Sequence, residues 1–204
     1  ETHIHNDYVS GGYQLARTHG VPYVVNADDP VDFERTGVRD GDELVCGSMK
    51  IKVIHTPGHT FTHLSYAVYD ADGTAAGVFT GGSLLPSSTG RPDLHGQQLA
   101  EEQARHQHAS AHRLVSMLDD ATPIHPTHGF GSFCSSTVSG VLASTIGDEK
   151  MANPALRDDV DTYVRDLLNG LDAYPAYYKH MGPANSAGPA QIDLSLPQRA
   201  TAED

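Results

Sequence analysis

The sequence contains few cysteines, few basic residues and no long apolar run, and each absence excludes a class of protein. Its two cysteines, Cys46 and Cys134, form neither a Cys-x-x-Cys pair nor a disulfide framework. Such sparse cysteine use is typical of a reducing compartment, and we expect a cytoplasmic protein. Thirteen Lys and Arg face 26 Asp and Glu, and the net charge of −13 argues against nucleic acid or an anionic membrane as a partner. No stretch approaches the ~18 apolar residues of a membrane span.

The chain is long enough for one substantial domain with a tail. Its 204 residues have 38% hydrophobic side chains and a mean hydropathy of −0.38, which is typical of a globular domain. After Gly182 the composition shifts to Pro, Ala, Gly, Ser and Gln, and no hydrophobic periodicity remains. We therefore expect one domain over residues 1–183 and a linker over residues 184–204.

Strands that end in glycine-containing loops alternate with amphipathic helices along the chain. The clearest helix carries an apolar stripe that includes Ala104, Ala111, Leu114 and Leu118. Residues 28–42 are polar and are predicted as a loop. The alternation predicts an α/β fold of layered sheets and helices. The predicted helices are 12–19, 99–118 and 158–171, and the predicted strands are 23–26, 44–46, 50–55, 64–69, 77–80 and 123–125.

Five potential metal ligands lie on three separate loops. His3, His5 and Asp7 alternate in the segment Thr-His-Ile-His-Asn-Asp, and alternate side chains of an extended backbone share one face. His59 follows Thr-Pro-Gly, and His128 lies in Pro-Thr-His-Gly. Imidazole and carboxylate together suit zinc, iron or manganese. The pattern therefore predicts a metal site to which all three loops contribute.

Several side chains near this site admit two interpretations. Asp7 is either a direct ligand or an acceptor that orients a ligand imidazole. His128 is either a ligand or a hydrogen-bonded structural histidine. Cys134 is either a reactive thiol near the cleft or a structural side chain in a Gly-Ser loop. His63 is expected to pack rather than to bind metal.

The motifs together resemble the metallo-β-lactamase superfamily. Within it the chain is similar to the glyoxalase II and persulfide dioxygenase branch, and most similar to the metallo-β-lactamase domain of bacterial metallo-β-lactamase–rhodanese fusion proteins. The resemblance runs from Glu1 to about Pro183. It rests on Thr-His-Ile-His-Asn-Asp-Tyr-Val-Ser-Gly-Gly at 2–12, His-Thr-Pro-Gly-His-Thr at 55–60, Phe-Thr-Gly-Gly-Ser-Leu-Leu at 79–85, Gly-Arg-Pro-Asp-Leu at 90–94, Pro-Thr-His-Gly-Phe-Gly-Ser-Phe-Cys at 126–134 and Tyr-Pro-Ala-Tyr-Tyr-Lys-His-Met at 174–181.

The resemblance implies the αββα sandwich of this superfamily. Members carry strands before the His-x-His motif, whereas this sequence starts on the motif itself. We therefore expect a domain that lacks its first strands and is N-terminally incomplete. The same comparison makes residues 184–204 a linker towards a rhodanese domain that is not present in this chain.

The resemblance also implies a metal site, with two departures from the family's ligands. The first position of the family corresponds to His3, His5 and His59, and the second to Asp7, residue 8 and His128. Tyr8 stands where a histidine belongs. Gly82 stands where an aspartate normally bridges both positions, and glycine offers no oxygen ligand. We expect one divalent ion, iron or zinc, that is weakly held or absent.

Three functions follow from this resemblance and its departures. The first is a persulfide dioxygenase-like enzyme of sulfur metabolism that acts on a low-molecular-weight thiol persulfide. The second is a zinc-dependent thioesterase-type hydrolase, similar to hydroxyacylglutathione hydrolase. The third is a non-catalytic scaffold that has lost its standard metal site. Asp7 is the expected catalytic residue, and Arg91, Tyr177 and Tyr178 are expected to contact the substrate.

The expected partners follow from the family resemblance and from the composition. They are a small thiol or thioester substrate and a rhodanese domain, fused or separate. A homo-oligomer is compatible with the sequence, and neither nucleic acid nor a membrane is expected.

Overall fold

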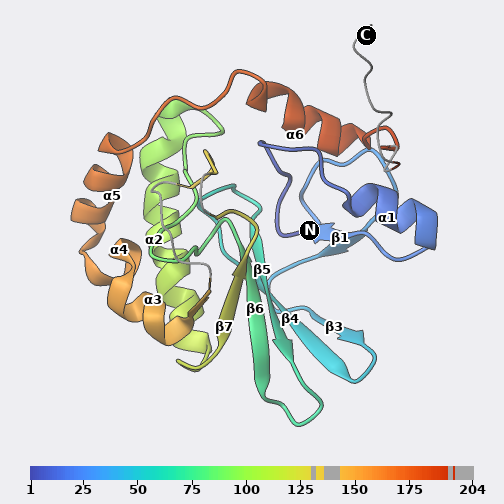
Figure 1. The fold of residues 1–204 in the computed structure, drawn as a ribbon, viewed down its shortest axis with the longest axis horizontal. Coiled ribbons are helices and arrows are strands. Elements are labelled where there is room, and N and C mark those ends of the chain that lie inside the picture. Colours follow the sequence, from blue (N-terminus) through green and yellow to red (C-terminus); the bar gives the residue numbers. More distant parts are fainter. Residues whose placement is uncertain (130–131, 136–142, 193–194, 196–204) are drawn as a thin grey trace, which may run out of the picture.

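A mixed six-stranded sheet forms the centre of the molecule (Figure 1). The computed structural model describes residues 1–129, 132–135, 143–192 and 195. Neighbouring strands are antiparallel except β6 and β7, which are parallel. The α/β class predicted from the sequence is confirmed. In the order in which they pair, the strands are β3 (Glu43–Cys46), β4 (Met49–His55), β5 (Leu64–Tyr69), β6 (Ala75–Gly81), β7 (Pro123–Pro126) and β8 (Ser144–Thr145).

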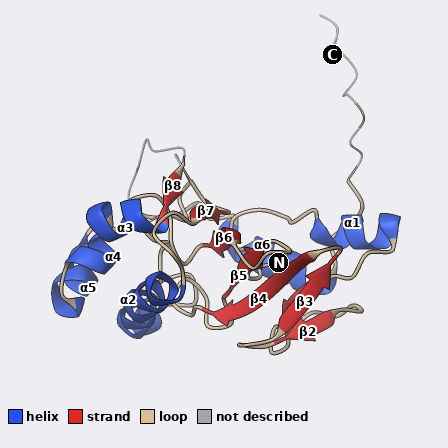
Figure 2. Ribbon diagram, turned by 90° about the horizontal axis from the view of Figure 1, so that it is seen from below, coloured by secondary structure: helices blue, strands red, loops and turns tan. Residues whose placement is uncertain are grey.

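Helices cover one side of this sheet, and the remaining elements lie on the other side of the molecule (Figure 1 and Figure 2). The covering helices are α2 (Ala100–Met117), α3 (Ile146–Ala152), α4 (Pro154–Arg157) and α5 (Val160–Asn169), and the short 3₁₀ helix η1 (Gln97–Leu99) precedes α2. The elements on the other side are α1 (Gly12–His19), the parallel pair β1 (Val24–Asn26) and β2 (Thr36–Val38), and α6 (Tyr178–Ala187).

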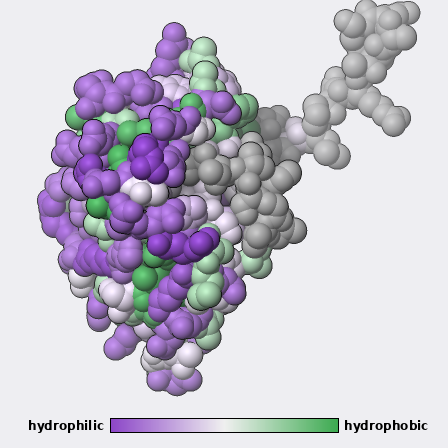
Figure 3. All heavy atoms as spheres, turned by 90° about the vertical axis from the view of Figure 1, so that its left-hand side faces the viewer, coloured by the Kyte–Doolittle hydropathy of each residue, from purple (hydrophilic) through white to green (hydrophobic). Residues whose placement is uncertain are grey.

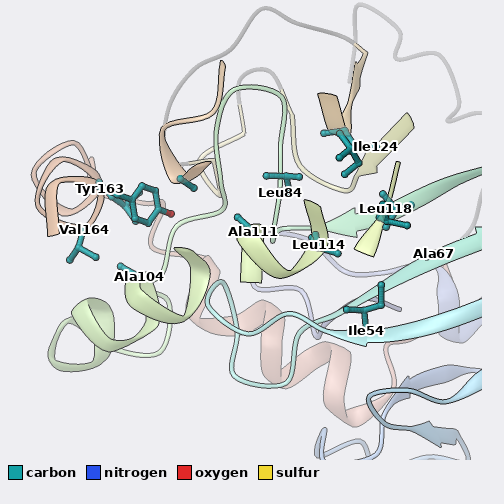
Figure 4. Packing of buried hydrophobic residues seen from close by; sticks show 14 residues of the cluster. Ile54, Ala67, Leu84, Ala104, Ala111, Leu114, Leu118, Ile124, Tyr163 and Val164 are labelled. Atoms are coloured by element: carbon teal, nitrogen blue, oxygen red, sulfur yellow. The ribbon is translucent and has the colours of Figure 1, made fainter. Parts of the chain in front are cut away.

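The apolar core lies between α2 and the sheet (Figure 4). Ala104, Ala111 and Leu114 recur at helical spacing on α2 and are fully buried in one cluster with the strand residues Ile54 and Val78. Hydrophilic side chains predominate on the outer surface of the helix layer (Figure 3). Within the described part of the chain, no helix has the length and the apolar character needed to cross a membrane.

The predicted helices and strands are confirmed, with ends that differ by one or two residues. The structure adds β2 inside the predicted loop 28–42, because this segment pairs in parallel with β1. It also adds α3 and α4, both of which begin at a side-chain cap. Thr145 accepts a hydrogen bond from Asp148 N, and Asn153 accepts one from Ala155 N.

Helix α6 passes through the predicted domain boundary. Pro183 lies inside this helix, and Asn185 is buried. The Asn185 side chain accepts a hydrogen bond from Ser10 N (2.8 Å) and donates to the carbonyl oxygens of His5 (2.9 Å) and Tyr8 (2.8 Å). These tertiary contacts outweigh the weak helix propensity of proline. The last turn of α6 therefore belongs to the fold and not to the predicted linker, which corrects that boundary.

Candidate metal centre

Four histidines from three loops converge at one edge of the main sheet. His3 and His5 lie in the loop before α1, His59 in the turn after β4 and His128 in the loop after β7. All four are buried, with at most 3% of their surface exposed. The His3 ring centroid lies 4.2 Å from that of His5, 4.8 Å from that of His59 and 5.3 Å from that of His128. The structure thus brings together the four histidines that the sequence singles out.

The turn that carries His59 is held against helix α2. Gly58 has a φ of +144°, and a Cβ at this position would lie 2.5 Å from Gln107 Cα. The Pro57 carbonyl oxygen accepts a hydrogen bond from Ser110 Oγ at 2.7 Å. Because the apolar core fixes α2, the turn gives His59 a rigid position.

An outer hydrogen bond fixes one ring nitrogen in both His59 and His128. His59 Nδ1 lies 2.8 Å from the Arg91 carbonyl oxygen, which can only accept, so Nδ1 carries the proton. His128 Nδ1 lies 3.3 Å from Asp7 Oδ2 and donates to that carboxylate. In His59 the Nε2 atom is therefore left unprotonated, which is the form of a ring nitrogen that binds metal.

Outer partners also hold His3 and His5. His5 Nε2 lies 3.3 Å from Glu1 Oε2 and 3.0 Å from Tyr8 Oη. A carboxylate can only accept, so His5 Nε2 carries the proton and Nδ1 is the free nitrogen. His3 Nδ1 lies 2.9 Å from Thr2 Oγ1, which leaves His3 Nε2 facing inward.

The inward nitrogens have the arrangement that a metal ion requires. His5 Nδ1 and His59 Nε2 are buried and find no hydrogen-bond partner among the described residues. His3 Nε2 and His128 Nε2 lie 3.3 Å apart. Two nitrogens at ~2.0–2.1 Å from one tetrahedral zinc ion lie about 3.3 Å apart, so this spacing fits a shared ion. A buried polar atom without a partner costs about 1–3 kcal/mol, and a bound ion would offset that cost.

Burial lowers the pKa of two of these imidazoles, His3 and His59. It lowers the pKa of His3 well below its ordinary value, and the neighbouring imidazoles add to the effect. Burial, followed by the charge on His128, lowers the pKa of His59 to about 3. Burial alone would raise the pKa of Asp7, but the hydrogen bond from His128 holds it below its ordinary value. At neutral pH His3 and His59 are therefore uncharged, and imidazoles beside one carboxylate are donors that suit zinc or iron.

Two overlapping groups of donors have the spacing of a metal site, and His128 belongs to both. One group is His3, His5 and His128, and the other is His59, His128 and Cys134. Within each group the ligand atoms all lie within 4.8 Å of one another. The family pattern predicts another division, with His59 beside the first two histidines and His128 at the second position. The structure differs because His128 Nε2 faces His3 Nε2 directly.

Asp7 and Tyr8 contact the histidines from outside. Asp7 belongs to neither donor group and holds His128 Nδ1, the position expected of an orienting acceptor. The Tyr8 ring stacks on His5 with centroids 4.4 Å apart. Burial and then the charge of Glu1 raise the pKa of Tyr8 above its ordinary value. The phenol therefore stays protonated at neutral pH and supports His5 without supplying an anionic ligand.

The His59 ring occupies the space that a side chain at position 82 would need. A Cβ on Gly82 would lie 2.6 Å from His59 Cγ. The backbone is not the obstacle, because Gly81 and not Gly82 has a positive φ, of +56°. The site therefore lacks the bridging carboxylate of the family pattern and also the room for one.

Of the three residues predicted to contact substrate, only Tyr177 faces solvent, with 50% of its surface exposed. Tyr178 is buried, and its Oη lies 3.8 Å from Cys134 Sγ. Arg91 is also buried, and its guanidinium donates to both carboxylate oxygens of Asp93 at 2.7 and 2.8 Å. Because these donors are already engaged, the predicted substrate contact is not open to the Arg91 side chain. Arg91 instead orients His59 through its backbone carbonyl.

Sequence reasoning missed the outer partners of the imidazoles. Thr2 directly precedes His3, and Glu1 lies four residues before His5. A polar residue at these spacings before a ligand histidine is the sequence signal that indicates such a partner. The Arg91 carbonyl leaves no trace in the sequence, because every residue has one. The position of Cys134 beside two histidines depends on a loop path that no local pattern encodes.

No protein-family profile matches the chain, but individual proteins do. A hydroxyacylglutathione hydrolase from Brucella anthropi is 39% identical over 93 residues, which cover 44% of this chain and 34% of that protein. The chain thus spans about a third of the length of this relative. The uncharacterized protein ML0493 from Mycobacterium leprae is 31% identical over 180 residues, which cover 76% of this chain and 73% of that protein.

Solved structures match over more of the chain. A metallo-β-lactamase from Staphylococcus aureus has a TM-score of 0.84 and 28% identity, and the match covers 98% of this chain and 60% of that chain. ETHE1 from Myxococcus xanthus has a TM-score of 0.75 and 26% identity, over 91% of this chain and 74% of that one. TTHA1623 in a di-iron-bound form has a TM-score of 0.53 and 26% identity, over 75% and 74% of the two chains.

The fold, the motif order and these relatives agree. The same three loops that the motifs mark carry the four converging histidines, on a scaffold shared with the solved structures. This chain belongs to the metallo-β-lactamase superfamily.

Proposed function

We propose that this protein is a metal-dependent enzyme that oxidises a low-molecular-weight thiol persulfide. The observation that supports a metal is the convergence of four buried imidazoles, in which His5 Nδ1 and His59 Nε2 have no hydrogen-bond partner among the described residues and His3 Nε2 lies 3.3 Å from His128 Nε2. The motif resemblance to persulfide dioxygenases and the structural similarity to ETHE1 from Myxococcus xanthus support the reaction. Overall, persulfide, dioxygen and water would give the thiol and sulfite.

Residues of this chain would hold the ion and accept the S–H proton of the persulfide. Histidines of this centre would bind the metal, and iron bound there would supply dioxygen activation. Asp7 Oδ2 orients His128, while Asp7 Oδ1 finds no hydrogen-bond partner among the described residues. That oxygen lies 4.0 Å from His5 Nδ1 and would accept the S–H proton of an incoming persulfide. Tyr177, whose ring lies beside that of Tyr178, is an exposed aromatic side chain that would be open to a substrate.

A second candidate is a zinc-dependent thioesterase-type hydrolase. The hydroxyacylglutathione hydrolase from Brucella anthropi supports it. The donor set supports it too. The centre is rich in imidazole and has no carboxylate at position 82, so it resembles a histidine-rich zinc site more than an iron site of two histidines and one carboxylate. Zinc bound here would supply the Lewis acidity for hydrolysis. A rhodanese domain remains the proposed partner, because sulfur transfer either makes or consumes persulfides.

The test is to load one preparation with different metals and give it both substrates. Protein purified without added metal is analysed for its metal content, then loaded with ferrous iron under anaerobic conditions or with zinc. Oxygen uptake with glutathione persulfide in the iron form supports the first function, whereas thioester hydrolysis in the zinc form supports the second. His59→Ala should abolish either activity, and His106→Ala, which removes an exposed imidazole of α2, should not. A protein that binds neither metal and turns over neither substrate is a non-catalytic scaffold.

A further inference from the structure

Cys134 lies against the histidine centre and not in an apolar core. It is 1% exposed, and its Sγ belongs to the donor group of His59 and His128, whose ligand atoms all lie within 4.8 Å of one another. Among the described residues, none of the three buried apolar clusters includes it. A buried structural cysteine normally packs among apolar side chains, so this placement calls for another explanation.

Arg91 positions both Cys134 and His59. Arg91 N donates to the Cys134 carbonyl oxygen at 2.8 Å, and the Arg91 carbonyl oxygen accepts from His59 Nδ1 at 2.8 Å. Cys134 N also donates to Ser132 Oγ at 3.1 Å. One buried residue therefore sets the thiol and the imidazole relative to each other, and His59 Nε2 remains without a partner among the described residues.

We propose that Cys134 supplies the anionic metal ligand that Gly82 cannot, and that the ion is held by His59 Nε2, His128 Nε2 and Cys134 Sγ. This inference rests on the proposed metal-dependent function and adds a ligand to its site. Position 82 has no room for a carboxylate, because a Cβ there would lie 2.6 Å from His59 Cγ. A thiolate at Cys134, which like His128 follows β7, would add one negative charge beside the imidazoles.

Imidazole nitrogens and thiolate sulfurs are both ligands that zinc binds in proteins. Three protein ligands would leave a fourth position for substrate or water. As the Sγ–metal bond forms, the S–H proton leaves to solvent, and no atom changes its oxidation state. Metal binding should therefore release a proton that a cysteine-free variant does not release.

Cobalt spectroscopy and thiol labelling test this ligand directly. Wild type, Cys134→Ser and the matched control Cys46→Ser, which removes an exposed thiol in β3, are loaded with cobalt(II). We expect a sulfur-to-cobalt charge-transfer band in the wild type and in Cys46→Ser, and none in Cys134→Ser. Zinc should protect Cys134, but not Cys46, from a thiol reagent. The zinc affinity of Cys134→Ser should fall roughly 100-fold, at the upper end of what loss of an outer partner costs.

The outcomes separate this inference from the proposed function. If the wild type binds cobalt without the band, and Cys134→Ser holds zinc as tightly, Cys134 is not a ligand although the metal-dependent function stands. If the wild type binds no metal, both proposals fail. Circular dichroism shows whether Cys134→Ser is folded, and Cys134→Ala serves as a second variant with the same expected loss of the band.

Discussion

The apolar core and the histidine centre are both buried, but only the core is complete without a ligand. Between α2 and the sheet, buried aliphatic side chains form one continuous cluster. At the loop edge of the same sheet, His5 Nδ1, His59 Nε2 and Asp7 Oδ1 find no hydrogen-bond partner among the described residues. Each unpaired polar atom costs about 1–3 kcal/mol. The first region therefore stabilises the fold, and the second holds a geometry that lowers stability until an ion binds.

The same contrast exists within one turn. His59 and His63 are both fully buried, and burial is the main cause that lowers the pKa of each. His63 Nδ1 lies 2.9 Å from Thr56 Oγ1, and His63 Nε2 accepts from Gly82 N at 2.9 Å. Both nitrogens of His63 are therefore engaged, whereas His59 keeps one free. A free inward nitrogen, and not burial, distinguishes a metal ligand from a packing histidine.

The largest expected effect is on the core. Leu114→Ala should lower the free energy of unfolding by about 3–5 kcal/mol, because it leaves a cavity in a fully buried cluster. Urea denaturation measures this change, and the variant that remains folded should bind zinc with wild-type affinity. Leu15→Ala, at a side chain that is 55% exposed, should change stability by less than about 0.5 kcal/mol. A large loss of zinc affinity in folded Leu114→Ala would contradict the claim that the core stabilises the fold without contributing to metal binding.

The second effect separates the two histidines of one turn. His59→Ala should weaken zinc binding roughly 100-fold, about 2.7 kcal/mol, as measured by competition with a chelator. His63→Ala should destabilise the metal-free protein by about 1–3 kcal/mol more than His59→Ala does, because it leaves Gly82 N without its acceptor. Both substitutions remove the same ring, so their cavity costs are similar. Equal losses of stability would show that a free nitrogen is not what sets His59 apart.

The third effect concerns Gly82, for which the sequence and the structure lead to opposite expectations. From the family pattern, Gly82→Asp should restore a ligand and tighten metal binding. In the structure the new side chain must displace the His59 ring, so we expect about 2 kcal/mol of destabilisation and no gain in zinc affinity. Calorimetric titration of the folded variant decides between them. Tighter binding would mean that the His59 ring moves aside at little cost.

The smallest effect tests a buried polar atom away from the histidines. Asp29 is buried, and its Oδ2 finds no partner among the described residues. Burial raises the pKa of Asp29 to about 6. The folded protein thus holds a proton that the unfolded chain releases near pH ~4, so this contribution to stability is lost as the pH rises from about 4 to 6. Asp29→Asn should stabilise the protein by about 1–2 kcal/mol at pH ~8 and not at pH ~4. The same difference at both pH values would show that Asp29 is ionised throughout.

The sequence predicts which loops meet but not which atoms face one another. Hydrophobic periodicity predicts the helices and strands of the core, because it reflects which side chains are buried. The motifs likewise mark the loops of His3, His59 and His128. The grouping of these side chains depends on contacts that no local pattern encodes, such as the Arg91 carbonyl behind His59. The sequence does not predict helix α6 for the same reason. Hydrogen bonds of Asn185 with a distant loop compensate for the unfavourable Pro183 inside the helix.

The side chain of Asn185 also has a consequence for the order in which the fold forms. Its hydrogen bonds to Ser10, His5 and Tyr8 join residues 175, 180 and 177 positions apart. During synthesis the loop with His3 and His5 is made long before α6, and these three hydrogen bonds can form only when that helix docks. Closing so long a loop is a late and slow event in folding. We therefore expect the contacts of Asn185 with this loop to form late in folding, after translation of α6.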